Sequence, residues 1–439
     1  MLLRDSFRKK AISTGGGARE SVPAASVDAR AEAGRLRALD GLRLLAALMV
    51  AVYHFLALDD DAARAWGQSA DTLFPQADFL APYGWLGVEV FYIISGFVIC
   101  MSCWGRTLGD FFRSRVIRLY PAYWAAVVLT FTVVTLAPVV FDPAPYWDAM
   151  VNLTMLQDPL GVDRVDDVYW TLWVELRFYL IFALVVSMGL TYRRVIAFCL
   201  AWTVMAPIVR ASEFAPLDVI VMPKYAHYFL IGVGLYLVHR FGHQLLTWLT
   251  VGANAMLAQH YAVLRMKHQA NDVVNETLHP WIVTAVLFGS ALLILAIARG
   301  HLSWVRWRWV TTAGALTYPF YLLHQRIGFT VIHWLYVDAG MSAYIVLPMT
   351  IAAMLVLAWL VHRYVEKPLA GWIKQRLSSG RGLALDPPDL LAAPTPAPVA
   401  PAGLPSSGEA GTASFDPSDL PRHRKPQVRR RGEFAITRK

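Results

Sequence analysis

The sequence predicts an all-α fold, a polytopic membrane helix bundle with about ten transmembrane helices and both termini cytoplasmic. The chain is 56% hydrophobic and only 16% charged, with a mean hydropathy of +0.44, whereas roughly a quarter of the residues in a soluble protein are charged. Apolar runs of about 20 residues, the length that crosses hydrocarbon, recur from residue 39 to residue 365. The polar breaks between these runs tend to alternate between basic and acidic.

Ten apolar runs are the candidate spans. They cover residues 39–58, 83–103, 121–141, 169–189, 195–211, 224–240, 244–263, 281–298, 311–336 and 341–365. The seventh run gives the weakest prediction because it holds Asn254, Gln259 and His260. If that run lies at the membrane surface instead, the two ends of the chain fall on opposite sides of the membrane.

The charges in the breaks favour ten spans. Basic residues precede the first span and follow the second, fourth and eighth, which places these breaks in the cytoplasm by the positive-inside rule: Arg30, Arg35, Arg37, Arg106, Arg113, Arg115, Arg118, Arg193, Arg194, Arg299, Arg306 and Arg308. The breaks after the first and third spans are rich in aspartate. We therefore interpret the net charge of +9 as topology and contact with anionic lipid headgroups, and not as nucleic-acid binding, for which the chain carries no motif.

The chain divides into three predicted parts. Residues 1–35 mix glycine, alanine and charge, lack the apolar core of a signal peptide, and are expected to form a flexible cytoplasmic segment. Residues 36–370 form the predicted membrane domain. Residues 371–439 are expected to be a disordered, basic cytoplasmic tail rich in proline and alanine, because such a composition cannot bury enough apolar surface to fold.

The first span carries three ionisable residues, Asp40, Arg43 and His54. Arg43 and His54 are separated by about three helical turns and about 16 Å of rise, so they share one helix face at different depths. With a cytoplasmic N-terminus, Arg43 lies near the inner surface and His54 in the outer half of the membrane. A charged group that faces lipid there costs at least about 2.5 to 3.5 kcal/mol. This face is therefore expected to point into protein or water.

Further ionisable residues are expected at the depth of His54. Counting along the second, fourth and ninth spans places Glu89, Glu175 and His324 in the same layer. Four arginines gather at the inner face, namely Arg43, Arg113, Arg115 and Arg118. The pattern predicts a passage with a basic inner mouth, suited to a phosphate-bearing ligand, and an outer half that holds groups suited to proton transfer.

The three cysteines do not suggest a metal site. Cys100 and Cys103 lie one helical turn apart, but no second pair of cysteines or histidines accompanies them at metal-ligand spacing. We interpret these two residues and Cys199 as packing residues and expect no metal cofactor.

Four stretches and a closing pair, taken together as a fifth motif, carry a family resemblance. LDGLRLLAALMVAVYHF contains Arg43, ten intervening residues and His54; GWLGVEVFYIISGFVI contains Glu89 and a Ser-Gly-Phe motif; WTLWVELRFYL contains Glu175. FFRSRVIRLYPAYW and the closing pair LTYPFYLLHQ and HRYVEKPL complete the set. In this order they resemble the motifs of the acyltransferase 3 family of integral membrane O-acyltransferases, from about Leu36 to Leu369, with Glu89 where the family more usually has aspartate.

This resemblance implies transfer of an acyl group, most often acetyl, from cytoplasmic acetyl-CoA to a hydroxyl of a cell-envelope carbohydrate such as an exopolysaccharide or lipopolysaccharide, in the bacterial cytoplasmic (inner) membrane. It implies that His54 is the general base, with Glu175 or Glu89 orienting its ring. It also implies that the donor phosphates bind at the basic inner mouth formed by Arg43, Arg113, Arg115 and Arg118. Direct transfer and an acyl-histidine intermediate use the same residues.

The acceptor is less constrained by the sequence. Some members of the family carry a fused extracytoplasmic hydrolase-like domain, which this sequence does not show, so we expect direct modification of the acceptor or the help of a separate extracytoplasmic partner protein. Other members acylate antibiotic sugars inside the cell. The sequence does not choose between these acceptors.

Each candidate residue also has a structural interpretation. His54 and His324 are compatible with hydrogen bonding between helices, and Glu89 with pairing to an arginine or tyrosine of a neighbouring helix. Ser95 of the Ser-Gly-Phe motif is compatible with a nucleophile, but Ser-Gly pairs in membrane helices more often permit close packing. A proton-coupled transporter would bury similar residues but usually shows internal repeats, and we find none. A purely structural scaffold would not need a layer of buried ionisable groups.

Overall fold

The computed structural model describes residues 24–272, 278–302, 304–305 and 307–378, which all belong to one compact unit. These residues form helices and no strand, which confirms the predicted all-α fold. The first helix, α1, begins at Ala24, so part of the segment expected to be flexible is helical. Most of the predicted tail, from residue 379 on, lies outside the described residues.

Within the part of the chain that the structure describes, eight helical segments are long and apolar enough to cross a membrane. They are formed by α1 (Ala24–Ala57), η1 with α4 (Ala81–Tyr83, Leu86–Cys103), α5 (Leu108–Leu136), η2 with α7 (Asp167–Tyr169, Trp170–Ser187), α8 (Tyr192–Ser212), α9 with α10 (Ala215–Val221, Ala226–Phe241), α12 (Pro280–Ala298), and α14 with η4 and α15 (Ala343–Val361, His362–Glu366, Lys367–Ser378). The remaining two predicted spans are α11 (Leu245–Asp272) and α13 (Arg308–His333), which are long but more polar. Each of the ten predicted spans thus falls on one long helix, and the side of the membrane that each end faces stays a prediction.

The polar residues of α11 and α13 lie against other helices. Asn254 of α11 contacts Nδ1 of His227 on α10 at 2.9 Å and donates to Thr203 of α8 at 2.8 Å. On α13, His324 and Gln325 are buried. These buried polar side chains make α11 and α13 less apolar than their neighbours. Asn254 and His324 have the polar partners on other helices that such groups need inside a bundle.

Helix α5 begins thirteen residues before the predicted span 121–141. Thr107 caps it, since its Oγ1 accepts a hydrogen bond from the backbone N–H of Asp110 at 3.2 Å. The stretch that carries Arg113, Arg115 and Arg118 is therefore helical, and its prediction as a polar break was wrong. The cap starts the helix in a charged segment that hydropathy does not identify as part of a span. Two apolar residues of this segment, Phe111 and Leu119, are buried.

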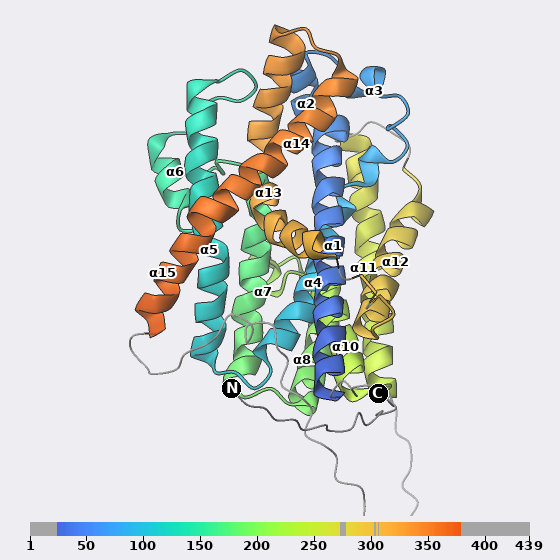
Figure 1. The fold of residues 1–439 in the computed structure, drawn as a ribbon. Coiled ribbons are helices and arrows are strands. Elements are labelled where there is room, and N and C mark those ends of the chain that lie inside the picture. The colour runs from blue at the N-terminus through green and yellow to red at the C-terminus, as the bar shows by residue number, and fades with distance from the viewer. Residues whose placement is uncertain (1–23, 273–277, 303, 306, 379–439) are drawn as a thin grey trace, which may run out of the picture. The chain divides into compact units, whose positions relative to one another are not determined.

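The centre of the bundle is formed by α1, α4, α7 and α13, with α5 and α6 (Tyr146–Asn152) on one side and α11 and α12 on the other (Figure 1). Helices α4 and α10 approach closely because of two glycines. A Cβ on Gly96 would lie 2.1 Å from the carbonyl oxygen of Phe229, and a Cβ on Gly232 would lie 2.0 Å from that of Ile93. This contact fixes α4 against α10 and leaves the neighbouring Ser95 to face the bundle centre, where it lines a cavity.

Candidate functional site

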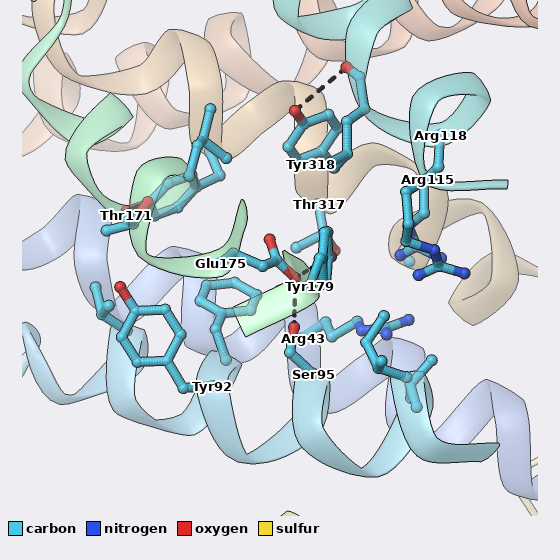
Figure 2. Close-up of a pocket in the computed structure, with 18 residues that line it drawn as sticks. Arg43, Tyr92, Ser95, Arg115, Arg118, Thr171, Glu175, Tyr179, Thr317 and Tyr318 are labelled. Carbon is cyan, nitrogen blue, oxygen red and sulfur yellow. Dashed lines mark hydrogen bonds between the residues drawn. The ribbon is translucent and has the colours of Figure 1, made fainter. Parts of the chain in front are cut away.

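Five helices enclose a cavity of about 100 Å³ in the centre of the bundle. Side chains from α1, α4, α5, α7 and α13 line it: Arg43, Val88, Phe91, Tyr92, Ser95, Val98, Ile99, Arg115, Arg118, Leu119, Thr171, Leu172, Glu175, Tyr179, Thr317, Tyr318 and Tyr321, together with Gly314. Figure 2 shows Arg115 and Arg118 on one side, Tyr92 and Thr171 on the other, and Glu175 between them. The cavity is therefore cationic at one end and lined by hydroxyl and aromatic groups at the other.

The arginine end of the cavity consists of Arg43, Arg115 and Arg118. Arg43 forms an ion pair with Asp40 one turn earlier on α1, at 3.4 Å. Arg115 lies over the ring of Tyr179, with its guanidinium carbon 5.8 Å from the ring centroid, and is 3.5 Å from the hydroxyl of Ser102. Three guanidinium groups outnumber the nearby carboxylates, so this end is suited to an anionic group such as a phosphate.

Arg113 does not belong to this cluster. It does not line the cavity, and its guanidinium group pairs instead with Asp110, at 3.4 Å. The helical path of α5 explains the separation. Arg115 and Arg118 lie about one turn apart on the face that meets the cavity, whereas Arg113 is two residues, or about 200°, away from Arg115.

Glu175 is the anionic group inside the cavity. Its Oε1 accepts a hydrogen bond from the hydroxyl of Ser95 at 2.6 Å and a second one from the hydroxyl of Tyr179. The hydrogen bond between Ser95 and Glu175 joins α4 to α7, and Glu175 holds the hydroxyls of Ser95 and Tyr179 toward the cavity. Ser95 thus does more than permit close packing, which is the role of its neighbour Gly96.

The prediction of one layer of ionisable groups was wrong for Glu175. The hydroxyl of Tyr321, at the midpoint of α13, donates to Thr171 at 3.0 Å, so α7 begins near the middle of the bundle and not at its surface. Glu175 lies four residues further along α7, and therefore about 6 Å closer to the arginine end. Glu89 precedes Ser95 by six residues on α4, or about 9 Å of rise, so the two glutamates lie at different depths.

His54 and His324 contact each other. Nδ1 of His54 lies 2.9 Å from Nε2 of His324, and Nδ1 of His324 lies 2.8 Å from the backbone oxygen of Tyr321. A carbonyl only accepts, so Nδ1 of His324 carries a proton, and in neutral rings Nε2 of His324 then accepts from Nδ1–H of His54. This order leaves Nε2 of His54 as the unprotonated nitrogen, which is the state that a general base requires.

The two glutamates do not orient the ring of His54. Glu89 is buried and forms an ion pair with Arg265 of α11 at 2.7 Å, and the Arg265 guanidinium lies over the rings of Trp85 and Trp170. Glu175 binds Ser95 and Tyr179. The ring of His54 is therefore oriented by His324 and not by a carboxylate, as we had predicted. Glu89 instead pairs with an arginine of a neighbouring helix, which was the structural alternative for this residue.

The tyrosines of the cavity were missed as site residues. Tyr179, Tyr318 and Tyr321 line it, and they lie within the stretches WTLWVELRFYL and LTYPFYLLHQ. The sequence does hold a signal for them. Tyr179 lies four residues after Glu175, and Tyr321 lies three residues before His324, so each tyrosine is expected on the same helix face as that site residue. Aromatic residues are so frequent in this chain that the spacing alone does not separate cavity residues from packing.

The cysteines lie apart from this site. Cys100, Cys103 and Cys199 are free thiols buried in the helix core. Among the described residues, no group of three or more histidine, cysteine, aspartate or glutamate side chains is arranged to hold a metal ion.

A family model described as an acyltransferase domain, acyltransferase 3, matches residues 36–363. The chain belongs to this acyltransferase family. The match begins within α1, ends just after α14, and contains every residue of the cavity. The five stretches that resemble the family in sequence thus fold into one bundle around one cavity.

Two relatives show more local similarity. O-acetyltransferase OatA of Staphylococcus aureus is 28% identical over 172 residues, which cover 35% of this chain and 25% of the relative. Acyltransferase MdmB of Streptomyces mycarofaciens is 27% identical over 157 residues, which cover 34% of this chain and 39% of the relative. The chain thus matches about a quarter to two fifths of the length of these acyltransferases. No solved structure matches the chain.

Proposed function

We propose that the protein is a membrane O-acyltransferase that moves an acyl group, acetyl in the simplest case, from cytoplasmic acetyl-CoA to a hydroxyl of a cell-envelope carbohydrate in the bacterial cytoplasmic membrane. Membership of the acyltransferase family supports acyl transfer. One observation carries the rest of the proposal, namely the order of groups along the bundle. The arginine end is followed by Glu175 and then by the paired rings of His54 and His324.

The donor is assigned to the cavity. Guanidinium groups bind phosphates through paired, charge-assisted hydrogen bonds, which suits Arg43, Arg115 and Arg118 to the phosphates of coenzyme A. A cavity of about 100 Å³ admits a thin chain and not a nucleotide, so the acyl-bearing arm is the part that enters. The carboxylate of Glu175 is an acceptor for amide N–H groups of that arm.

His54 is the proposed general base. Its Nε2 takes the proton of the acceptor hydroxyl, the acceptor oxygen bonds to the acyl carbon, and the carbon–sulfur bond breaks. The released thiolate of coenzyme A then recovers the proton from the imidazolium. In the alternative route, the same nitrogen bonds to the acyl carbon first and coenzyme A leaves as its thiolate. The acceptor oxygen then bonds to the acyl carbon, the bond from nitrogen to the acyl carbon breaks, and the proton of the acceptor hydroxyl passes to the released thiolate.

The test uses purified protein in liposomes, with labelled acetyl-CoA inside and envelope glycans from cells that lack the gene outside. The proposal predicts label on the glycan as an alkali-labile ester. A proton-coupled transporter would move solute without forming an ester, and that result would contradict the proposal. Label that enters only a soluble glycosylated metabolite supplied inside the vesicles would favour the second acceptor class, an antibiotic-type sugar.

A further inference from the structure

A second, larger hollow lies at the opposite end of the bundle from the arginine end. This far groove has a volume of about 830 Å³ and is lined by residues 138–145, by the loop at 158–164, by Arg64 of α2 (Asp59–Trp66), and by Asp167 and Arg326. Arg64 follows the C-terminal end of α1, and residues 138–145 follow the C-terminal end of α5. Arg43 lies 14 residues before the C-terminal end of α1, and Arg115 lies 21 residues before that of α5. These intervals are about 21 and 32 Å of helical rise, so the far groove and the arginine end are well separated along the bundle.

The histidine pair lies between the two hollows. Along α13, Tyr321 lines the central cavity, His324 contacts His54, and Arg326 lines the far groove. Arg326 follows Tyr321 by five residues, which is about 7.5 Å of rise. A ligand in the far groove is therefore placed on the other side of the histidine pair from a ligand in the cavity.

Fixed ion pairs build the far groove. Arg326 pairs with Asp167 at 3.2 Å and lies over the ring of Phe141, 4.8 Å from its centroid. Arg164 donates from Nε to Asp158 at 2.9 Å. These contacts hold guanidinium groups, carboxylates and an aromatic ring in place before a ligand arrives, and preorganised polar groups of this kind give specificity to a binding site.

Two carboxylates of the far groove remain available. Asp142 and Asp163 are exposed, and within the described chain no hydrogen bond or ion pair engages their side-chain oxygens. An ionised carboxylate accepts hydrogen bonds only. These two positions are therefore suited to donors such as sugar hydroxyls.

The charge of the lining favours a neutral ligand. Three arginines stand against four aspartates. Two further carboxyls next to the groove hold their protons more tightly than usual. Burial raises the pKa of Asp166 to about 7, although nearby Arg326 opposes the shift, and burial together with Asp167 raises the pKa of Asp61 against the effect of Arg64 and Arg326. The nearly balanced charge contrasts with the cationic arginine end, which suits phosphates.

We propose that the far groove binds the acceptor as a neutral, hydroxyl-rich glycosyl unit, with Asp142 and Asp163 accepting hydrogen bonds from its hydroxyls. This inference rests on the proposed function, because it places the acceptor across the histidine pair from the donor. It adds the site of the acceptor and its charge class to that function.

The test measures the initial rate of label transfer in the liposome assay at saturating acetyl-CoA. The probes are neutral and acidic glycan fractions from cells that lack the gene, separated by anion exchange. We expect the wild-type protein to label the neutral fraction. The Asp142→Asn/Asp163→Asn variant should need about tenfold more glycan for half-maximal rate, because it loses charge-assisted hydrogen bonds, and should keep its maximal rate within about twofold.

The matched control is Asp60→Asn, which removes an exposed carboxylate of α2 that does not line the groove and should leave the half-maximal concentration unchanged. Arg64→Gln removes a guanidinium group from the lining of the groove. It gives a second groove variant, with the same expected rise in the glycan concentration at half-maximal rate. An unchanged half-maximal concentration in both groove variants, or label only in the acidic fraction, overturns the far-groove proposal while acyl transfer itself stands. If the wild-type protein labels neither fraction, the proposed function fails first.

Discussion

Nδ1 of His54 and Nε2 of His324 lie 2.9 Å apart and join α1 to α13. The two residues are separated by most of the chain, yet His324 is fully buried and its other nitrogen is bound to a backbone carbonyl. His324 therefore has one nitrogen left for His54 and sets which nitrogen of His54 carries the proton. In this account His324 is a positioning residue and His54 is the base.

Replacing His324 should weaken the base without removing it. His324→Leu removes the acceptor for Nδ1–H of His54 and should lower kcat about 10- to 100-fold, because the ring loses its fixed tautomer. His324→Gln offers an amide oxygen at a similar reach and should recover part of this loss. Measured pH profiles of kcat should also differ between the two variants, and identical rates and profiles in both would show that His324 only fills space.

Replacing the arginines of α5 should affect coenzyme A binding only at the positions that line the cavity. Arg115→Gln with Arg118→Gln should raise the Kd for coenzyme A about 100-fold, since two charge-assisted contacts to phosphate are lost, and added salt should weaken wild-type binding. Arg113→Gln, on the same helix but paired with Asp110, is the matched control and should change Kd less than about twofold. Equal losses in both variants would argue for general surface charge in place of a defined phosphate site.

Glu175 and Ser95 should differ in importance even though they share a hydrogen bond. Glu175→Gln removes the charge that holds two hydroxyls and should lower acyl transfer about 10- to 100-fold. Ser95→Ala removes one of these hydroxyls and should cost less than about tenfold. A loss near 10⁶-fold for Ser95→Ala, the scale seen when a true nucleophile is removed, would instead make Ser95 the acyl acceptor.

Glu89 should prove structural. Its carboxylate is buried against Arg265, and breaking a buried ion pair from one side costs about 3 to 5 kcal/mol. Glu89→Gln should therefore lower the thermal unfolding midpoint in detergent. Glu89→Gln combined with Arg265→Met should restore part of the stability and keep acyl transfer within about threefold of wild type. A double variant that is stable but inactive would show that Glu89 takes part in catalysis.

Hydropathy and helical spacing predicted much of this architecture. All ten predicted spans fall on long helices, and the shared depth of His54 and His324 corresponds to a direct contact. Both predictions succeeded for the same reason. A long apolar run indicates a membrane-spanning helix, and the rise of 1.5 Å per residue gives the depth of each residue along that helix.

The errors arose where the first residue of a helix differs from the start that hydropathy predicts. Helix α5 extends into a charged stretch because Thr107 caps it, and α7 begins mid-bundle, so counting from the surface placed Glu175 too far from the arginine end. The partner of Glu89 was also beyond reach. Arg265 comes from α11, 176 residues later, and spacing within one helix says nothing about which neighbour packs against it.

The central claim is that His54 is the base for acyl transfer, and His54→Ala tests it most directly. The measurement is kcat for labelled acetyl transfer to the neutral glycan, beside the Kd for coenzyme A in the same preparation. Loss of a general base should lower kcat by about 10² to 10⁴, while the arginine end keeps the Kd within about twofold of wild type. A variant with wild-type kcat and wild-type Kd would contradict the account.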